Sequence, residues 1–283
     1  MKLVRYGPHS REKPGLLDRS GVLRDLSDHV ADIAPETLGP DVLARLAALP
    51  TERLAVVEGD RRLGAPVAGV RQFIAVGLNF ADHARESGLP IPDEPVLFMK
   101  AVSCLSGPYD DVVLPRGSSK VDWEVELGLV IGRTGRYLAE AEALDHLAGF
   151  VLVNDVSERA FQMERGGTWD KGKGCETFGP IGPWLVTPDE VGDFDGLDMW
   201  LDVNGRRMQN GNTRTMIFRA PALISYISQF MTLLPGDVIT TGTPPGVGLG
   251  QKPHPVYLKA GDVMSLGIDG LGEQRQTVVT CPD

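Results

Sequence analysis

The sequence predicts a mixed β fold with inserted helices (α+β), and three observations support this class. Short β-type runs recur from residue 71 onward, with Gly, Pro or Asp turns between them. Only three helical patterns interrupt these runs, so the chain lacks the strict alternation of strands and helices of a doubly wound sheet. The 34 Gly and 21 Pro indicate many turns, and 42% hydrophobic residues suffice for a core. We expect a rolled or barrel-like sheet.

The first 65 residues are predicted to form a small β-rich cap domain, and residues 66–283 a second, larger domain. Residues 2–6 are expected to form a strand, and residues 14–26 two strands around a turn at 18–21. A short helix should begin at Pro40 and end before Pro50. The boundary is placed near residues 60–70, where a turn at 58–61 and Pro66 interrupt the pattern.

Within the larger domain, hydrophobic patterns predict eight strands and three helices. The expected strands lie in residues 72–78, 95–100, 123–132, 149–155, 182–187, 197–205, 237–243 and 262–269. The expected helices lie in residues 140–148, 158–165 and 220–234. The last of these has its apolar residues at core spacing, which is typical of packing rather than of a cofactor site.

Composition excludes several classes of function. A net charge of −10 and a pI near 5.0 argue against a nucleic acid as partner. The sequence contains neither a signal-peptide core nor an apolar window of about 18 residues, so we expect no membrane segment. Cys104, Cys175 and Cys281 form no CxxC pair, which fits a reducing compartment and excludes a cysteine-based zinc site. We therefore expect a cytoplasmic protein.

Acidic residues alternate with apolar ones in residues 121–127. Because side chains on a strand alternate between faces, Asp122, Glu124 and Glu126 should share one face. They could form a solvated outer face or a crowded site that needs a cation, and this segment alone does not decide between the two.

A second acidic segment favours the cation site. Residues 149–154 form a continuous apolar run that ends at Asp155, which could complete a set of three carboxylates. Neither histidine nor thiolate ligands are evident beside them. The donor set therefore favours Mg²⁺ or Mn²⁺ over Zn²⁺.

Six ordered motifs resemble the fumarylacetoacetate hydrolase family across residues 73–278. They are VGLNFADHARESG (76–88), PVLFMK (95–100), VDWEVELGLVIG (121–132), VNDVSERAFQ (153–162), DKGKGCETFGPIGPW (170–184) and ITTGTPPGVG (239–248). The stretch at residues 165–187 is most similar to the branch of diketo-deoxy-sugar-acid hydrolases and ureidoglycolate lyases. The resemblance implies a mixed β-roll catalytic domain, usually a homodimer, with Mg²⁺ held by Glu124, Glu126 and Asp155. Asp122 is not among the ligands that this family uses.

His83 and Glu86 stand three residues apart, on one face of a predicted helix. Spacing alone favours an ordinary surface pair, which contributes little energy. The family resemblance instead implies a lid that carries a catalytic His–Glu dyad, in which the carboxylate orients a general base. It also implies that Lys173 is an active-site lysine, whereas Lys171 is read as a solvated loop residue.

Three further residues are assigned to substrate binding. Arg159 and Gln162 follow Asp155 at helical spacing. Arg159 could bind a substrate carboxylate through a bidentate pair of hydrogen bonds, or it could form a plain salt bridge to the neighbouring acids. Thr243 matches the family's pocket loop, whose glycines lack the order of a phosphate-binding motif. Weaker candidates are Thr177, Lys100 and Ser103.

The leading hypothesis is metal-dependent hydrolysis of a C–C bond in a 2,4-dioxo acid, either an acylpyruvate or a 2,4-diketo-3-deoxy-sugar acid, to pyruvate and a second acid. The resemblance leaves other reactions open: oxaloacetate decarboxylation, isomerisation of 2-hydroxyhepta-2,4-diene-1,7-dioate and ureidoglycolate cleavage. A hypothesis of another class is a metal-stabilised binding domain without catalysis. The combination of His83, Glu86 and Lys173 weighs against it.

Overall fold

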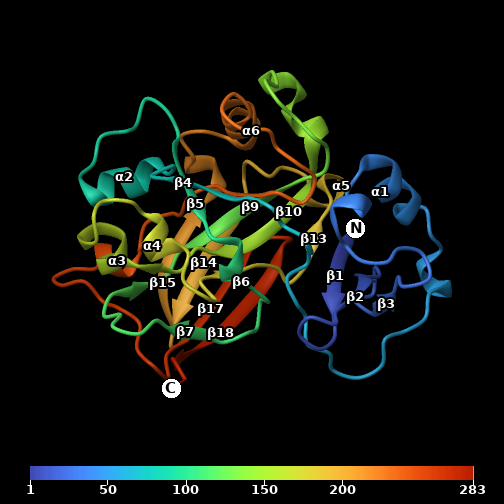
Figure 1. Ribbon diagram of the computed structural model, residues 1–283, viewed down its shortest axis with the longest axis horizontal. Coiled ribbons are helices and arrows are strands. Elements are labelled where there is room, and N and C mark those ends of the chain that lie inside the picture. Colours follow the sequence, from blue (N-terminus) through green and yellow to red (C-terminus); the bar gives the residue numbers. More distant parts are fainter. Residues whose placement is uncertain (283) are drawn as a thin grey trace.

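A nine-stranded sheet runs through the computed structural model, which describes residues 1–282 (Figure 1). Its strand order is β3-β2-β1-β13-β10-β9-β16-β4-β5. The strands are β1 (Lys2–Tyr6), β2 (Lys13–Leu17), β3 (Leu23–Asp25), β4 (Phe73–Gly77), β5 (Val96–Lys100), β9 (Val125–Ile131), β10 (Leu147–Asn154), β13 (Leu185–Val186) and β16 (Val238–Thr240). β9 and β10 are apolar along almost their whole length and lie at the centre, covered on both faces.

A second sheet packs on the centre of the first. Its order is β15-β14-β17-β18-β7. Its strands are β7 (Val112–Leu114), β14 (Asp198–Val203), β15 (Arg206–Asn212), β17 (Val263–Ile268) and β18 (Gly272–Thr280). Two short pairs complete the set, β6 (Leu105–Ser106) with β12 (Gly179–Pro180) and β8 (Val121–Asp122) with β11 (Ser157–Glu158). The predicted mixed β class is confirmed, and in residues 1–282 the sheets stay open rather than closing into a barrel.

The core between the two sheets contains buried amides as well as apolar side chains. The Gln274 side chain donates to the Leu152 carbonyl at 2.9 Å, and Asn154 donates to Gln276 at 3.1 Å. Each bond joins a strand of the second sheet to β10. Because buried polar groups need partners, these bonds fix the relative position of the sheets as well as their distance.

Helices are short and lie around the sheets. The α-helices are α1 (Pro40–Ala47), α2 (Ala81–Ser87), α3 (Arg159–Glu164), α4 (Asp170–Lys173), α5 (Pro188–Val191) and α6 (Ala220–Ser228). The 3-10 helices are η1 (Pro35–Thr37), η2 (Thr51–Arg53), η3 (Val102–Cys104), η4 (Glu140–His146), η5 (Thr213–Thr215) and η6 (Gly248–Gly250). α2, α3 and α4 gather on the side of the molecule opposite β1–β3 (Figure 1). In residues 1–282 no helix has the length and apolar character to cross a membrane.

Two predicted helices are corrected by the structure. Residues 140–146 form the 3-10 helix η4, and the last two residues of the predicted segment, Leu147 and Ala148, begin β10. The helix predicted for residues 220–234 ends at Ser228. It ends early because Leu233 and Gly135 exchange backbone hydrogen bonds of 2.9 Å, which a continuing helix would not allow.

The acidic strand is also interrupted. Residues 121–122 form β8, which pairs with β11, whereas β9 starts only at Val125. The Asp122 carboxylate accepts the Trp123 amide at 2.8 Å, and the Gln209 side chain accepts the Val125 amide at 2.9 Å. Side chains thus satisfy backbone donors that a continuous strand would pair with its neighbour. Asp122 and Glu124 are therefore placed by a bend, not by strand alternation.

The first three strands continue the nine-stranded sheet, since Lys2 and Leu3 of β1 pair with Val186 and Leu185 of β13. The predicted strands and turn within residues 2–26 and the helix at Pro40 are present. That residues 1–65 fold as a domain of their own stays a prediction.

Candidate active site

Three buried carboxylates meet where β9 begins and β10 ends. Glu126 is paired with Val153 across the two strands, and the Asp155 amide donates to the Glu124 carbonyl at 2.8 Å. This register brings Glu124, Glu126 and Asp155 together, with one oxygen from each within 4.8 Å of the others. The antiparallel pairing explains how acids about 30 residues apart in the sequence share one site.

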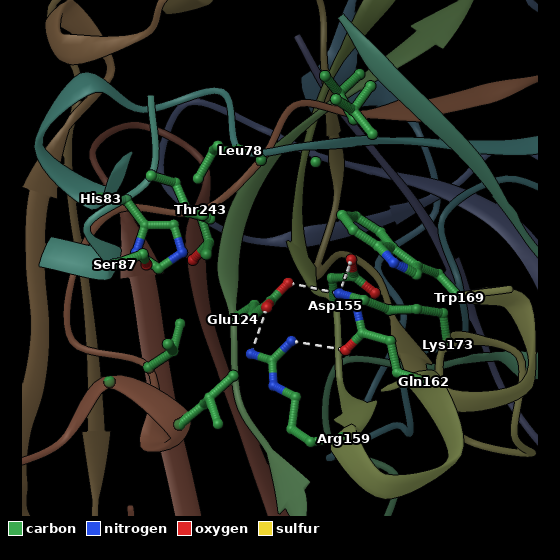
Figure 2. A pocket seen from close by; sticks show the side chains of 18 of the residues that line it. Leu78, His83, Ser87, Glu124, Asp155, Arg159, Gln162, Trp169, Lys173 and Thr243 are labelled. Atoms are coloured by element: carbon green, nitrogen blue, oxygen red, sulfur yellow. Dashed lines mark hydrogen bonds and ion pairs between the residues drawn. The ribbon is translucent and has the colours of Figure 1, made fainter. Parts of the chain in front are cut away.

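Two cationic side chains hold Glu124 between them (Figure 2). The Lys173 ammonium donates to Glu124 at 2.7 Å and to Asp155 at 2.6 Å. Arg159 donates to the other oxygen of Glu124 at 2.6 Å, and its Nε donates to Asp122 at 2.8 Å. A third cation, Lys100, donates to the second oxygen of Asp155 at 2.6 Å. Charge-assisted hydrogen bonds of this kind are stronger than neutral ones.

Two neighbouring glutamates have opposite pKa shifts. Burial alone would raise the pKa of Glu124, but the charges of Lys173 and Arg159 outweigh it and lower the pKa to about 2. The pKa of Glu126 is raised well above its usual value, by burial and by the negative charges of Asp155 and Glu124. Burial would lower the pKa of Lys173, yet Asp155 and Glu124 raise it, so the ammonium stays charged.

The three carboxylates fit a divalent cation. Glu126 accepts hydrogen bonds from the Thr240 hydroxyl and from the Gly242 amide at 2.8 Å, but no ammonium or guanidinium group bonds to it among residues 1–282. Burial and the negative charges of Asp155 and Glu124 raise its pKa, and a bound cation would offset both effects. All three ligands are oxygens, the donors that Mg²⁺ and Mn²⁺ prefer.

α2 presents the predicted His–Glu pair to the same cavity. The Nδ1 of His83 lies 3.1 Å from Glu86. Glu86 also accepts the Gly246 amide at 3.2 Å, so it joins α2 to the glycine-rich loop that follows β16. Gly88, with a φ of 66°, ends the helix in the left-handed conformation that glycine tolerates best. The carboxylate thereby fixes one ring nitrogen and leaves Nε2 for proton transfer.

One cavity of about 510 Å³ connects these groups. All nine predicted site residues line it: His83, Glu86, Glu124, Glu126, Asp155, Arg159, Gln162, Lys173 and Thr243. In Figure 2, His83 and Thr243 lie to one side of Glu124, and Lys173 and Trp169 lie to the other. The catalytic, binding and ligand roles assigned to these residues stay predictions, but their meeting at one cavity is a structural fact.

The three predicted binding residues are held by hydrogen bonds. Arg159 donates through Nη1 to the Gln162 side chain at 3.1 Å, so two of its five N–H groups stay available for a substrate carboxylate. The Thr243 hydroxyl donates to the Val125 carbonyl at 2.9 Å and accepts from Gln209 at 2.8 Å. Thr243 can therefore accept one further hydrogen bond from a ligand.

Asp122, although it is not part of the triad, organises the site around it. Its carboxylate accepts from Arg159 and also from the amides of Gly248 and Leu249, at 2.6 and 3.0 Å. One acid thus connects the arginine to the glycine-rich loop. The sequence placed Asp122 beside the ligands but gave no sign of these partners.

Lys100, only a weak candidate in the sequence, is buried and bonded to Asp155. The one signal for it was a charge at the end of the apolar strand β5. Trp169 and Phe98, which meet edge to face at 5.2 Å, line the cavity without any sequence signal. The other weak candidates lie elsewhere: the Thr177 hydroxyl accepts the Val113 amide, and Ser103 lines a different cavity.

A buried acidic triad, its paired cations and an oriented imidazole around one cavity define an enzyme-type site. Comparison with known proteins specifies the class further. Residues 72–279 match the family described as fumarylacetoacetate (FAA) hydrolase C-terminal, and the chain belongs to this family.

Its relatives include proteins of different activity. A protein of Burkholderia ambifaria, 60% identical over 277 residues and 98% of each chain, carries only a provisional hydrolase name. The maleylpyruvate hydrolase of Sphingobium, solved with manganese(II) and pyruvate, is 31% identical over the full length of both chains, with a TM-score of 0.81. The 2-hydroxyhepta-2,4-diene-1,7-dioate isomerase of Mycobacterium marinum is also 31% identical over both full chains, with a TM-score of 0.77. The family is therefore fixed, whereas its members' reactions differ.

Proposed function

We propose that this enzyme hydrolyses a C–C bond in a 2,4-dioxo acid, giving pyruvate and a second carboxylic acid. The observation that carries the proposal is the oriented His83 on the wall of the cavity that also contains the carboxylate triad. A metal site alone would suit many reactions, but hydrolysis also needs a base for water. The maleylpyruvate hydrolase of Sphingobium, solved with manganese(II) and pyruvate, supports the same proposal.

Glu124, Glu126 and Asp155 would hold Mg²⁺ or Mn²⁺, which when bound supplies a Lewis acid for the oxygens of an oxo acid. Arg159 binds the substrate carboxylate through its two remaining N–H groups. The cation of Lys173, held by Glu124 and Asp155, offers its third N–H to the negative charge that develops on the oxo-acid end.

His83 takes a proton from a water molecule, while Glu86 holds its other ring nitrogen. The oxygen of that water attacks the C4 carbonyl, and a new C–O bond forms. The C3–C4 bond then breaks, and its electron pair moves to the C2–C3 unit as an enolate. The proton that His83 took from water is returned to C3 and gives pyruvate, and the attacked carbonyl leaves as the second acid.

Isomerisation is a second candidate, favoured by the Mycobacterium marinum enzyme. It would use the same triad and Lys173 but would need no water at C4. The two reactions are distinguished by their products.

The test is an assay for pyruvate from acetylpyruvate and from a 2,4-diketo-3-deoxy-sugar acid, with Mg²⁺ or with a chelator. Oxaloacetate, ureidoglycolate and an unsaturated oxo-dioate serve as alternative substrates. Hydrolysis predicts pyruvate in equal amount with a second acid that has taken up ¹⁸O from labelled water. Failure to cleave any dioxo acid contradicts the proposal, and an absorbance change without cleavage supports isomerisation instead.

A further inference from the structure

The cavity divides into a polar inner end and an apolar mouth. At the inner end Glu124, Glu126 and Asp155 are buried with their cations. Toward the opening the wall is largely hydrocarbon, formed by the exposed side chains of Leu89, Val96, Met163 and Leu249. The difference is one of depth, because Leu89 and Met163 are 53% and 49% exposed whereas the carboxylates are not.

The exposed apolar side chains of the mouth come from separate parts of the chain. Leu89 follows α2, Met163 lies on α3, and Leu249 lies on η6. Single exposed apolar residues are ordinary on a protein surface, but a cluster around a cavity marks a site that a ligand covers. Their convergence is therefore better explained by a bound molecule than by chance.

The wall offers little to a hydroxylated ligand. Among the residues that line the cavity outside the inner end, Ser87, Thr243 and Lys252 bring a hydroxyl or an ammonium group, beside the His83–Glu86 pair. The Thr243 hydroxyl already bonds to Val125 and Gln209. The Gln162 oxygen is already bonded to Arg159. At the stretch formed by Leu89, Met163 and Leu249, a polyhydroxylated group would lose bonds to water without replacing them all, which weakens binding.

We propose that the substrate group beyond C4 is a hydrocarbon chain or ring, held at the mouth by Leu89, Met163 and Leu249. This inference rests on the proposed function and specifies its substrate class: an acylpyruvate with an apolar acyl group, not a diketo-deoxy-sugar acid. The cavity volume of about 510 Å³ lies within the range of roughly 300–1,000 Å³ typical of ligand pockets, so it leaves room beyond a five-carbon oxo acid.

The first test measures binding and needs no turnover. Straight-chain 2-oxo acids from 2-oxobutanoate to 2-oxooctanoate are titrated calorimetrically into the Mg²⁺-loaded enzyme. Each added methylene should raise the affinity about threefold to fourfold until the mouth is filled. A flat series overturns the proposal, and so does tighter binding of a 3-deoxy-2-oxo sugar acid than of the alkyl 2-oxo acid of equal carbon number.

Substitutions show whether the named side chains cause the gain in affinity for each added methylene. Leu249→Gln and Met163→Gln should reduce it to less than about twofold per methylene, because a polar group replaces part of the apolar wall. Leu144→Gln is the matched control, since Leu144 is 38% exposed against 37% for Leu249 and lies on η4, outside this cavity. If the gain in affinity per methylene is unchanged in Leu249→Gln, or is lost in Leu144→Gln, the assignment of these side chains to the subsite is contradicted.

Turnover separates this inference from the proposed function. Cleavage of acetylpyruvate, which has only a methyl group beyond C4, tests the hydrolase proposal by itself. If neither acetylpyruvate nor any longer acylpyruvate is cleaved but the 2-oxo acid series shows the gain in affinity, the hydrolase proposal fails and the apolar subsite stands. If acetylpyruvate is cleaved and longer acylpyruvates show no higher kcat/KM, the subsite proposal fails and the reaction stands.

Discussion

Glu124 and Glu126 stand two residues apart, yet the protein gives them opposite electrostatic surroundings. Glu124 bonds to both Lys173 and Arg159, which lower its pKa to about 2 despite burial. Within residues 1–282, Glu126 bonds only to a hydroxyl and a backbone amide, and its pKa is raised. Burial raises the pKa of both carboxyls, so the difference between them follows from the two cations that bond to Glu124.

The position of the triad predicts how the replacement of each acidic residue will change metal affinity. Asp155→Asn should weaken Mn²⁺ binding by about 100-fold or more, because it removes a carboxylate oxygen from the cluster. Asp122→Asn should weaken it by about tenfold or less, since Asp122 contacts Arg159 rather than the triad. Titration calorimetry measures both. Equal effects of the two substitutions would contradict the assignment of Asp155 as a ligand.

Replacing His83 should lower turnover without changing metal affinity, the opposite of what is expected for the ligands. His83→Ala should lower kcat by about 10²–10⁴-fold, since the proposed general base is lost, and should leave the Mn²⁺ affinity within about twofold. His29→Ala, at an exposed histidine away from the cavity, is the control and should retain full activity. Normal turnover in His83→Ala would exclude the dyad mechanism.

At the scale of elements, the long apolar strands at the centre of the first sheet could be predicted, whereas the polar strands β15 and β18 of the second could not. β9 and β10 are nearly continuous apolar runs, which both identified them and placed them in the core. β15 and β18 were missed, because Gln209, Gln274 and Gln276 point into the protein where apolar residues were expected. Each glutamine finds buried hydrogen-bond partners that no sequence pattern reveals.

The site, too, could be predicted only in part. Its acids, His83 and Lys173 lie in motifs and were found. Lys100 was not assigned, because its partner Asp155 is 55 residues away and only the folded sheet brings them together. The apolar mouth was missed for a related reason: its residues come from segments that look like ordinary loops and helix ends.

Gly77, the last residue of β4, is predicted to admit no side chain. A Cβ there would lie 2.4 Å from the Trp169 ring, so Gly77→Ala must displace the indole from the cavity wall. We expect a loss of about 1–3 kcal/mol in the free energy of unfolding, measured by urea denaturation. Gly39→Ala is the control, because nothing lies near that position, and should cost less than about 1 kcal/mol. Equal losses would contradict this packing.

At the scale of the whole molecule, the buried acids link metal binding to stability. Because the pKa of Glu126 is raised in the folded protein, its neutral form contributes stability at low pH. That contribution is lost as the pH rises above the ordinary value of 4.5 and through the raised pKa. Glu124, with a folded pKa of about 2, contributes a constant amount over the same range.

The melting temperature should follow this balance. In a chelator, Tm should fall as the pH rises above 4.5, because the folded protein keeps on Glu126 a proton that the unfolded chain releases. A fixed concentration of Mg²⁺ should raise Tm more strongly at pH 9 than at pH 6, because protons compete with the metal for Glu126 and raise Kd at the lower pH; a concentration of 100 times Kd corresponds to about 2.7 kcal/mol of stability. Differential scanning calorimetry tests this. An equal Mg²⁺ effect at both pH values would contradict the role given to Glu126.

The homodimer expected from the family resemblance stays a prediction, which sedimentation can test in the same buffers.

The division of the cavity between sheet and periphery has a consequence for how such an enzyme diversifies. Glu124, Glu126 and Asp155 belong to the central strands or to the residues that adjoin them, where any change disturbs the core. Leu89, Met163 and Leu249 lie outside the sheets, in three unconnected stretches that tolerate substitution. A descendant could therefore exchange its preferred acyl group by a few surface replacements and inherit the reaction chemistry unaltered. Enzymes with one scaffold and many substrates are the expected result of that separation.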